Sequence, residues 1–158
     1  MSGPDEIDIR PVTSGAAPQL ADVHATGFDE PWGTDAIRDI IAMPGAFGLM
    51  AASGEHIPGF VLARVAGDEA EILTIAVAAS HRRRGLGRRL IEAAAAASIA
   101  SGASALFLEV AEDNPAAIAL YQNLGFTTVG RRPGYYRRRG GASVAALTMR
   151  LDLADQSQ

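Results

Sequence analysis

Apolar residues recur at helical spacing in two segments near the start of the chain. The first segment is 15–28, and the second follows Thr34, which we expect to be an N-cap, and stops at Pro44-Gly45. Between them, residues 30–33 are predicted to form a turn. Before them, the short run 7–11 predicts an edge strand that ends at a proline.

From residue 47 onward, short apolar runs bounded by glycine predict strands more often than helices. Two segments are predicted to be helices: one opens at Gly85-Leu86-Gly87 and continues to about residue 100, and the other is 115–124, which ends at Gly125. The arginine-rich segment 131–141 is predicted to be a loop. The predicted strands are 47–53, 57–67, 71–77, 105–110, 126–130 and 144–151.

The order of these elements, β-α-α-β-β-β-α-β-α-β-β, predicts the α/β class, with a mixed central sheet flanked by helices. The chain of 158 residues has the length of one domain, which we place at 1–153, followed by a frayed tail at 154–158. A hydrophobic content of 48% and a charged content of 20% are typical of a folded globular protein.

The composition excludes several kinds of chemistry. There is no cysteine, so disulfides, thiolate metal sites and a cysteine nucleophile are excluded. There is also no lysine, so all 14 cationic side chains are arginine, and neither a lysine Schiff base nor a Walker phosphate loop can form. His24, His56 and His81 are dispersed without ligand spacing, so we expect surface histidines and no metal site.

The charges are divided unevenly between the two halves of the chain. Residues 1–71 hold 12 acids and 3 arginines, whereas residues 72–158 hold 6 acids and 11 arginines. This asymmetry indicates that the second half meets an anion. The acidic N-terminus does not resemble a secretory signal, and the longest uncharged stretch, 93–108, is broken by serines and a glycine. We therefore expect a cytoplasmic protein without a membrane span.

The strongest candidate for anion binding is the junction between the strand 71–77 and the helix that follows it. A helix start offers backbone N–H groups without partners and the positive end of a dipole. Gly85 and Gly87 remove side chains where a ligand would approach the backbone. This arrangement suits a pyrophosphate, and the alternative is a glycine-containing loop beside a solvated basic face. The flanking arginines are Arg82, Arg83, Arg84, Arg88 and Arg89.

Two further residues are candidates for acid–base chemistry. Glu109 interrupts the apolar strand 105–110, where the alternation places it on the face opposite the leucines. A carboxylate partly shielded from water takes up a proton more readily, and the alternative is a strand-end residue in an ion pair. Tyr121 lies two helical turns beyond Asn114, the expected N-cap of the helix 115–124, and its alternative role is core packing.

These motifs together resemble a known family. The run Arg82-Arg83-Arg84-Gly85-Leu86-Gly87 after a strand resembles the R/Q-x-x-G-x-G/A acetyl-CoA motif of the GNAT N-acetyltransferase superfamily. Most of the chain is also similar to the RimI type, the bacterial ribosomal-protein alanine N-acetyltransferases. The motifs that carry this second similarity are Glu30-Pro31-Trp32, the run 108–126, Arg131-Arg132 and Tyr135-Tyr136.

The resemblance implies the GNAT fold and direct attack of an amine on the thioester of acetyl-CoA. It implies Glu109 as general base and Tyr121 as general acid toward the departing thiolate. The implied partner is the N-terminus of a protein, beginning with alanine and belonging to a ribosomal protein, with no nucleic acid and no membrane. The residues implied to hold acetyl-CoA are Ile75, Ala76, Val77, Arg83, Arg84, Gly85, Leu86, Gly87, Arg88 and Asn114.

An N-terminal α-amine is also the easier nucleophile, because its pKa is about 7.7–8.0 against about 10.4 for lysine. The segment 137–143 departs from the RimI pattern, and arginines 137–139 would repel a basic substrate. A small-molecule amine is therefore an alternative substrate. An alternative of a different class is an RNA-binding module that uses 82–89 and 131–139, although few aromatics interleave there and the isoelectric point is about 5.3.

Overall fold

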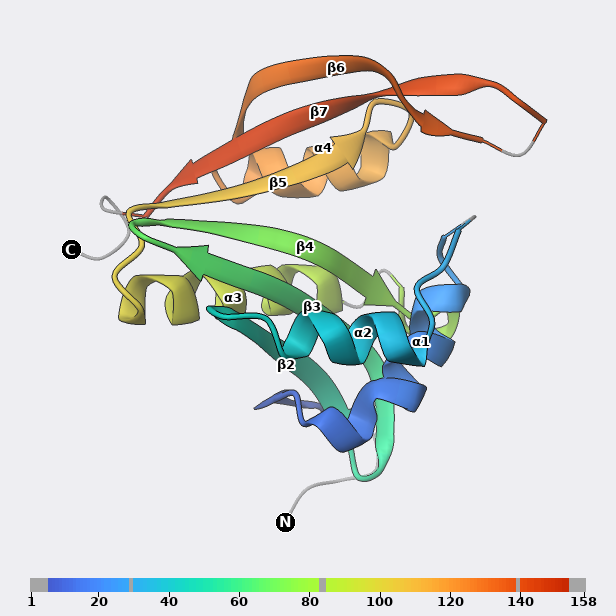
Figure 1. The fold of residues 1–158 in the computed structure, drawn as a ribbon, viewed down its shortest axis with the longest axis vertical. Helices are drawn as coiled ribbons and strands as arrows, with labels where there is room; N and C mark the ends of the chain where they lie inside the picture. The colour runs from blue at the N-terminus through green and yellow to red at the C-terminus, as the bar shows by residue number, and fades with distance from the viewer. Residues whose placement is uncertain (1–5, 29, 83–84, 139, 154–158) are drawn as a thin grey trace. The chain divides into compact units, whose positions relative to one another are not determined.

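The computed structural model describes residues 6–28, 30–82, 85–138 and 140–153. Within these ranges the chain forms seven strands, four α-helices and two short 3₁₀ helices, in the predicted order (Figure 1). The elements are β1 (Asp8–Pro11), η1 (Ser14–Ala16), α1 (Ala17–Ala25), α2 (Thr34–Ile41), β2 (Ala46–Ser53), β3 (His56–Ala66), β4 (Glu69–Val77), η2 (Ala79–His81), α3 (Leu86–Ala100), β5 (Ala105–Ala111), α4 (Pro115–Asn123), β6 (Thr127–Arg137) and β7 (Ser143–Asp152).

The strands have the order β1-β2-β3-β4-β5-β7-β6 in one sheet. Residues 69–71 of β4 pair in parallel with residues 105–107 of β5. The pairs β1–β2, β2–β3, β5–β7 and β6–β7 are antiparallel. The predicted α/β class with a mixed sheet is therefore confirmed. β1 is an edge strand that ends at Pro11, as expected.

The chain divides into two compact units. Unit 1 contains Met1–Arg64 and Leu73–Ala97, and unit 2 contains Val65–Ile72 and Ser98–Gln158. Strands β3 and β4 contribute residues to both. The placement of a single domain at 1–153 stays a prediction, and the expected tail 154–158 lies outside the described residues.

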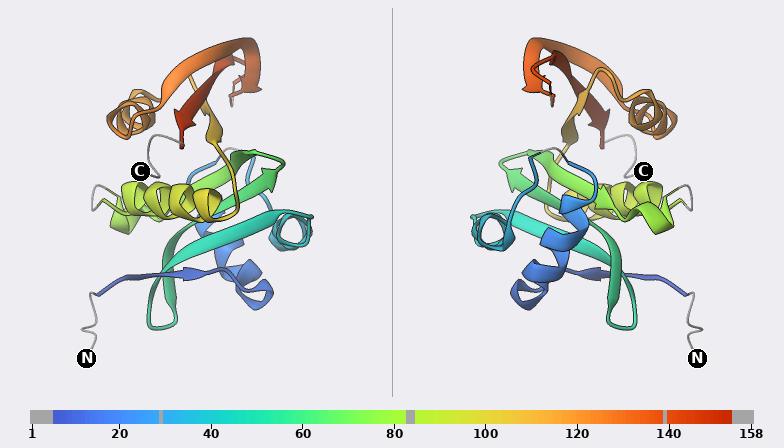
Figure 2. Two further views of the ribbon diagram at one scale, coloured as in Figure 1. Left: turned by 90° about the vertical axis from the view of Figure 1, so that its left-hand side faces the viewer. Right: turned by 90° about the vertical axis from the view of Figure 1, so that its right-hand side faces the viewer.

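In unit 1, helices cover both faces of β3 (Figure 2). Phe60 and Leu62 belong to a buried cluster with Leu20 of α1 and Ile37 of α2. Gly59 faces α3 on the other side, where a Cβ added to it would lie 3.4 Å from the Cδ1 atom of Leu90. Because both faces are covered, this part of the strand is a continuous apolar run without alternation.

In unit 2, β5 shows the predicted alternation. Leu106, Leu108 and Val110 are buried on one face, whereas Phe107 and Glu109 are partly exposed on the other. The strand pairs with β7 over seven consecutive residues, from Ala105 opposite Asp152 to Ala111 opposite Ala146. This register decides which side chains of β5 can reach solvent or a substrate.

The prediction of a loop at 131–141 is wrong in its first half, because β6 continues to Arg137. The ladder with β7 has an irregularity between Arg132 and Tyr136, where Pro133 and Gly134 stand and Gly134 has a φ of +64°. Proline lacks the N–H that a central strand needs, but β6 lies at the edge of the sheet, where this loss is tolerated. Residues 131–137 lack the alternation of apolar and polar residues that is typical of a strand, so the sequence pattern did not predict this part of β6.

The helix ends are mostly as predicted. Gly102 and Gly125 follow α3 and α4 with φ of +93° and +104°, the left-handed conformation that ends a helix. The prediction of Thr34 as an N-cap is wrong by one residue: Gly33 is the N-cap, and Thr34 is the first residue of α2. No helix in the described part of the chain is long and apolar enough to cross a membrane.

Candidate active site

The candidate anion site in unit 1 is the start of α3. The backbone N–H of Arg89 donates to the carbonyl of Gly85 at 3.1 Å, which marks Gly85 as the residue that precedes the helix. Gly85 has a φ of +77°, a conformation that side chains with a Cβ rarely adopt. In this geometry the N–H groups of Leu86, Gly87 and Arg88 have no carbonyl partner within the helix and point along its axis.

The arginines around this helix start make contacts within unit 1. Arg82 donates from Nε to the carbonyl of Val77 at 3.1 Å and from Nη2 to the carbonyl of Thr26 at 3.4 Å. Arg89 donates to the carbonyl of Ile7 at 2.8 Å. Arg88 pairs with Glu92, one turn along the helix, at 3.7 Å. The side chains described here therefore support the fold, and the backbone N–H groups are what α3 offers to an anion.

Arg83 and Arg84, which the sequence also places in this site, lie outside the described residues. Ile75, Ala76 and Val77 form the end of β4, one 3₁₀ turn and a short loop before α3. The carbonyl of Val77 already accepts from Arg82. Pairing of a ligand with this strand end would therefore use the other backbone groups of residues 75–77.

The candidate catalytic residues, Glu109 and Tyr121, both belong to unit 2. The side chain of Glu109 is 24% exposed, and its Oε1 atom lies 3.6 Å from the Nη2 atom of Arg132 on β6. Both alternatives weighed from the sequence are thus present: the carboxylate is partly shielded from water, and it forms an ion pair. An ion pair at this distance keeps the carboxylate in place without covering it.

Tyr121 is nearly buried on α4, with 7% of its surface exposed, and its ring lies 5.8 Å from the ring of Phe126. Burial raises the pKa of Tyr121 to about 12, with a smaller contribution from Tyr136. The phenol is therefore protonated throughout the physiological range and can donate a hydrogen bond. Core packing and a donor role are compatible for this residue, because one edge of the ring packs while the hydroxyl remains a donor.

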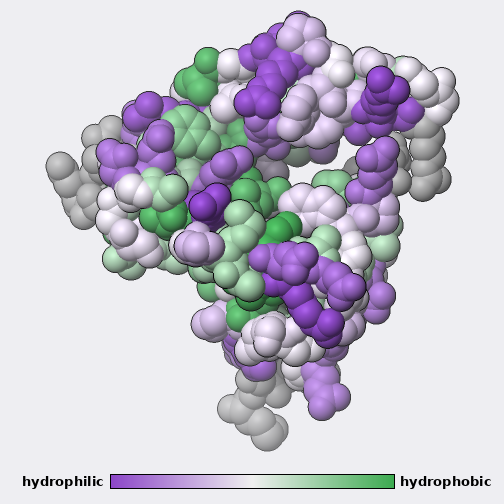
Figure 3. Space-filling view, in the orientation of Figure 1, coloured by the Kyte–Doolittle hydropathy of each residue, from purple (hydrophilic) through white to green (hydrophobic). Residues whose placement is uncertain are grey.

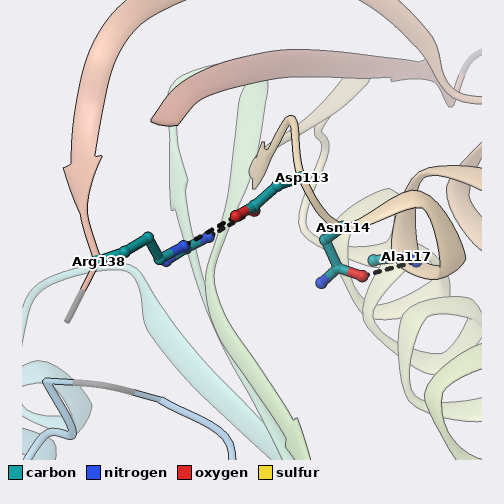
Figure 4. A network of polar contacts seen from close by, with 4 residues as sticks. All are labelled: Asp113, Asn114, Ala117 and Arg138. Carbon is teal, nitrogen blue, oxygen red and sulfur yellow. Dashed lines mark hydrogen bonds and ion pairs between the residues drawn. The ribbon is translucent and has the colours of Figure 1, made fainter. Parts of the chain in front are cut away.

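Asn114 is the N-cap of α4, as predicted. Its Oδ1 atom accepts a hydrogen bond from the backbone N–H of Ala117 at 3.2 Å (Figure 4). The preceding residue, Asp113, accepts two hydrogen bonds from Arg138, at 2.7 and 3.0 Å. The turn between β5 and α4 is therefore held at both of these positions.

A family model described as the acetyltransferase (GNAT) family matches residues 17–126. The chain belongs to the GNAT acetyltransferase family. It is 38% identical over 161 residues to the N-alpha-acetyltransferase RimI of Mycobacterium tuberculosis, covering 95% of this chain and 98% of that one. It is also 40% identical over 99 residues to the [ribosomal protein bS18]-alanine N-acetyltransferase of Salmonella typhimurium, covering 63% of this chain and 67% of that one.

The fold agrees with these relatives. The crystal structure of the ribosomal-protein-S18-alanine N-acetyltransferase from Escherichia coli has a TM-score of 0.88 and 28% sequence identity, covering 94% of each chain. The predicted GNAT fold and RimI type are confirmed, and the protein is an acetyl-CoA-dependent N-acetyltransferase. This membership favours the enzyme over the RNA-binding alternative.

Sequence reasoning left Tyr136 without a role in this GNAT enzyme. Burial raises the pKa of Tyr136, and Glu109 raises it further, while Arg138 and Arg132 lower it. Its hydroxyl therefore lies within electrostatic range of Glu109 and of two arginines, and it in turn acts on Tyr121. The sequence contains the pair Tyr135-Tyr136, but only the structure shows that Tyr136 is the partly buried residue and Tyr135 the exposed one.

The expectation that all histidines lie at the surface is wrong for His24, which is 1% exposed in unit 1. Its Nδ1 atom accepts from the backbone N–H of Trp32 at 3.0 Å, so the proton resides on Nε2, which contacts the Thr74 hydroxyl at 3.1 Å. The ring stacks on Phe28, with centroids 3.9 Å apart. Trp32 packs against the buried core of unit 1.

Among the described residues, no group of three or more His, Asp or Glu side chains could hold a metal ion. The two remaining histidines, His56 and His81, lie with their rings 5.4 Å apart.

Burial lowers the pKa of His24 from 6.5 to about 4, so the unfolded chain binds a proton that the folded protein does not. This contribution to stability is complete above about pH 6.5 and falls by up to about 1.4 kcal/mol per pH unit down to about pH 4. We expect the free energy of unfolding, measured in urea, to show this slope. In His24→Gln, which keeps a donor and an acceptor, the slope between pH 6.5 and 4.5 should be smaller. Equal slopes in the two proteins would contradict this account.

Proposed function

We propose that this enzyme transfers the acetyl group of acetyl-CoA to the N-terminal α-amine of a protein, with the N-terminal alanine of ribosomal protein bS18 as its substrate. The observation that carries this proposal is the 38% identity, over nearly the whole of both chains, to an N-alpha-acetyltransferase of the RimI type. The relatives named for alanine of bS18 support the choice of substrate. With a ribosomal protein as substrate, the reaction would take place in the cytoplasm.

For binding of acetyl-CoA, unit 1 would supply backbone groups of Ile75–Val77 and the segment 83–88. The diphosphate would meet the N–H groups of Leu86, Gly87 and Arg88 at the positive end of α3. Asn114 of unit 2 would donate its amide to the pantetheine arm while its oxygen caps α4. The charges of Arg83, Arg84 and Arg88 would add a favourable potential for the phosphates.

For the chemistry, we propose Glu109 as the base that takes a proton from the α-ammonium group, directly or through one water. The free amine then attacks the thioester carbonyl carbon, and the C–N bond forms. The C–S bond then breaks with its electron pair going to sulfur, and the surplus proton on nitrogen passes through water to the thiolate, which leaves as the CoA thiol. An α-amine with a pKa near 8 gives up its proton to a modest base far more easily than a lysine does. The ion pair with Arg132 holds the side chain of Glu109 in place.

We propose that Tyr121 donates a hydrogen bond to the sulfur as it leaves. A phenol with a pKa of about 12 is a weaker acid than an ordinary tyrosine, and a thiol ordinarily has a pKa of about 8.5. Complete transfer from Tyr121 to a free thiolate would therefore be uphill. A hydrogen bond from the phenol to the sulfur avoids this free-energy cost. It still lowers the activation barrier, because it stabilises the negative charge that develops on sulfur.

The substrate proposal is tested with a panel of peptides assayed for release of free CoA, with mass spectrometry to locate the acetyl group. The panel contains peptides with N-terminal alanine and with other first residues, an N-terminally blocked peptide with internal lysine, and a small primary amine. We expect the alanine peptides to react fastest. Equal rates for internal lysine, or a faster rate for the small amine, would refute the proposal.

Replacing Gly87 with valine places a branched side chain where the backbone of α3 would approach the diphosphate. We expect a higher KM for acetyl-CoA and a smaller rise in the melting temperature on adding acetyl-CoA. Gly87→Ala, with a single added methyl group, should show a smaller effect. If Gly87→Val is stabilised by acetyl-CoA as strongly as the unmodified enzyme, the diphosphate binds elsewhere.

Tyr121→Phe removes the hydroxyl and keeps the ring that packs on Phe126. We expect kcat to fall by about 10²–10³-fold, as is typical when one hydrogen-bond donor to a developing negative charge is removed. The melting temperature and the affinity for acetyl-CoA should change little, which separates loss of chemistry from loss of structure. A kcat close to that of the unmodified enzyme would leave Tyr121 with a packing role alone.

Glu109→Gln removes the base and keeps the shape of the side chain. We expect kcat to fall most at low pH and to recover partly as pH rises toward 9, because the α-amine then loses its proton without help. Glu112→Gln is the matched control: Glu112 lies three residues away and pairs with Arg131, so its removal should leave the pH profile unchanged. A uniform loss at every pH in Glu109→Gln would argue against a role in proton removal.

A further inference from the structure

The end of α1, which comprises residues 24–28, lies mostly on the surface of unit 1. Of these residues, His24 is buried and the other four are exposed. Hydrophilic residues also cover the outward side of α2, the helix that comes next (Figure 3). A segment with few buried apolar contacts depends on a small number of polar ones for its position. One of these is the contact of the His24 ring with the Thr74 hydroxyl of β4, at 3.1 Å.

A second contact joins the end of α1 to β4 through the side chain of Arg82. Arg82 donates from Nη2 to the carbonyl of Thr26 at 3.4 Å and from Nε to the carbonyl of Val77, the last residue of β4, at 3.1 Å. Carbonyls at the end of a helix lack partners within it and lie at the negative end of its dipole, so an arginine is a suitable donor to them. One guanidinium group therefore bridges the end of a helix and the end of a strand.

Gly27 leaves the room that this bridge needs. A Cβ atom added to Gly27 would lie 3.3 Å from the Nη2 atom of Arg82, so the guanidinium packs directly on the glycine. The φ angle of Gly27 is not in the left-handed region, so the backbone conformation does not require a glycine here. By contrast, a Cβ atom added to Gly33, the N-cap of α2, would meet nothing within 4 Å. The missing side chain of Gly27 therefore matters for the contact with Arg82.

Val77 connects this bridge to the acetyl-CoA site, because the end of β4 is the part of the strand proposed to pair with the ligand. The parallel pairing of β4 with β5 covers residues 69–71. Further along, Arg82 contacts the carbonyl of Val77, and the N–H of Ala78 donates to the carbonyl of Pro58 on β3 at 2.7 Å. These two contacts fix the direction in which the strand end presents its remaining backbone groups.

We propose that Arg82 is a positioning residue that couples the binding of acetyl-CoA at the end of β4 to the position of the end of α1. With the bridge intact, the backbone of Val77 is already held when acetyl-CoA arrives. Without the bridge, binding must also restrict this part of the chain, which lowers the affinity. Because such coupling is reciprocal, acetyl-CoA should in turn hold the end of α1 more firmly. The inference rests on the proposed placement of acetyl-CoA and adds a residue that acts through Val77.

The first test measures the Kd and KM for acetyl-CoA, and kcat at saturating acetyl-CoA, with an N-terminal alanine peptide as acceptor. In Arg82→Gln, we expect Kd and KM to rise about two- to tenfold, the factor that corresponds to one hydrogen bond, with kcat nearly unchanged. Arg82→Lys keeps the charge but cannot bridge two carbonyls as a guanidinium does, so its Kd should also be raised. A Kd of Arg82→Lys equal to that of the unmodified enzyme would show that charge alone matters and would overturn the inference.

Gly27→Val tests the bridge from its other end, since it leaves Arg82 and β4 unaltered. The branched side chain would displace the guanidinium, so we expect Kd and KM for acetyl-CoA to rise as in Arg82→Gln. Gly33→Val is the matched control, because the same substitution is made where a Cβ atom meets open space. Unchanged affinity in Gly27→Val, or an equal loss in Gly33→Val, would contradict the coupling.

Trp32, the only tryptophan of the chain, reports on the end of α1. Its ring lies 5.1 Å from the ring of His24, and its N–H donates to that ring. We expect saturating acetyl-CoA to reduce the quenching of its fluorescence by acrylamide in the unmodified enzyme, and to have little effect in Arg82→Gln or Gly27→Val. No reduction in the unmodified enzyme, or an equal reduction in Arg82→Gln, would refute the reciprocal effect and with it the inference.

A comparison with Gly87→Val separates failure of the inference from failure of the proposed function. If Gly87→Val weakens the binding of acetyl-CoA but the variants of Arg82 and Gly27 do not, only the inference fails. If Gly87→Val binds acetyl-CoA as tightly as the unmodified enzyme does, the proposed placement of acetyl-CoA fails, and the inference fails with it.

Discussion

The register of β5 is the constraint on which unit 2 depends. Burial of Leu106, Leu108 and Val110 on one face forces Glu109 onto the other, and pairing with β7 over seven residues keeps it there. A slip by one residue would bury the carboxylate and expose the leucines, at a cost of about 1.5–3 kcal/mol for each large apolar side chain. The position of the proposed base therefore follows from hydrophobic burial on the opposite face of its own strand.

The same strand organises the charges around it. Glu109 and the turn after β5 present carboxylates to two arginines of β6 and to Arg138, which follows β6 directly. Exposed ion pairs contribute little to stability, typically below about 1 kcal/mol each. These pairs matter mainly because they determine where net charge remains on the surface of unit 2. Arginine is well suited to such pairs. Arginine binds a carboxylate in a fixed two-pronged geometry that lysine cannot form.

Unit 1 shows a different solution for a polar group. His24 is buried as a neutral ring because both nitrogens have partners, one on the segment before α2 and one on β4. Burial removes water from around the ring, and this desolvation lowers the pKa of His24 to about 4. A charged imidazole would also lose the acceptor for the N–H of Trp32. These two contacts of His24 connect the segment that contains Trp32 to β4, the strand that precedes α3.

The sequence by itself determined the order of the elements, the alternation in β5, the N-cap at Asn114, and the candidates Glu109 and Tyr121. These follow from periodicity and from interactions between residues close along the chain. It did not reveal the second half of β6, the burial of His24, the place of Tyr136 or the partners of the arginines. Each of these depends on contacts between residues far apart in sequence. The edge position of β6 allows Pro133 in a strand. Trp32 and Thr74 supply the hydrogen bonds that a buried His24 needs, and Asp113 forms an ion pair with Arg138. Only the tertiary structure determines these contacts. The local sequence pattern indicates which conformation a residue prefers, whereas the fold determines which distant groups lie close enough to interact with it.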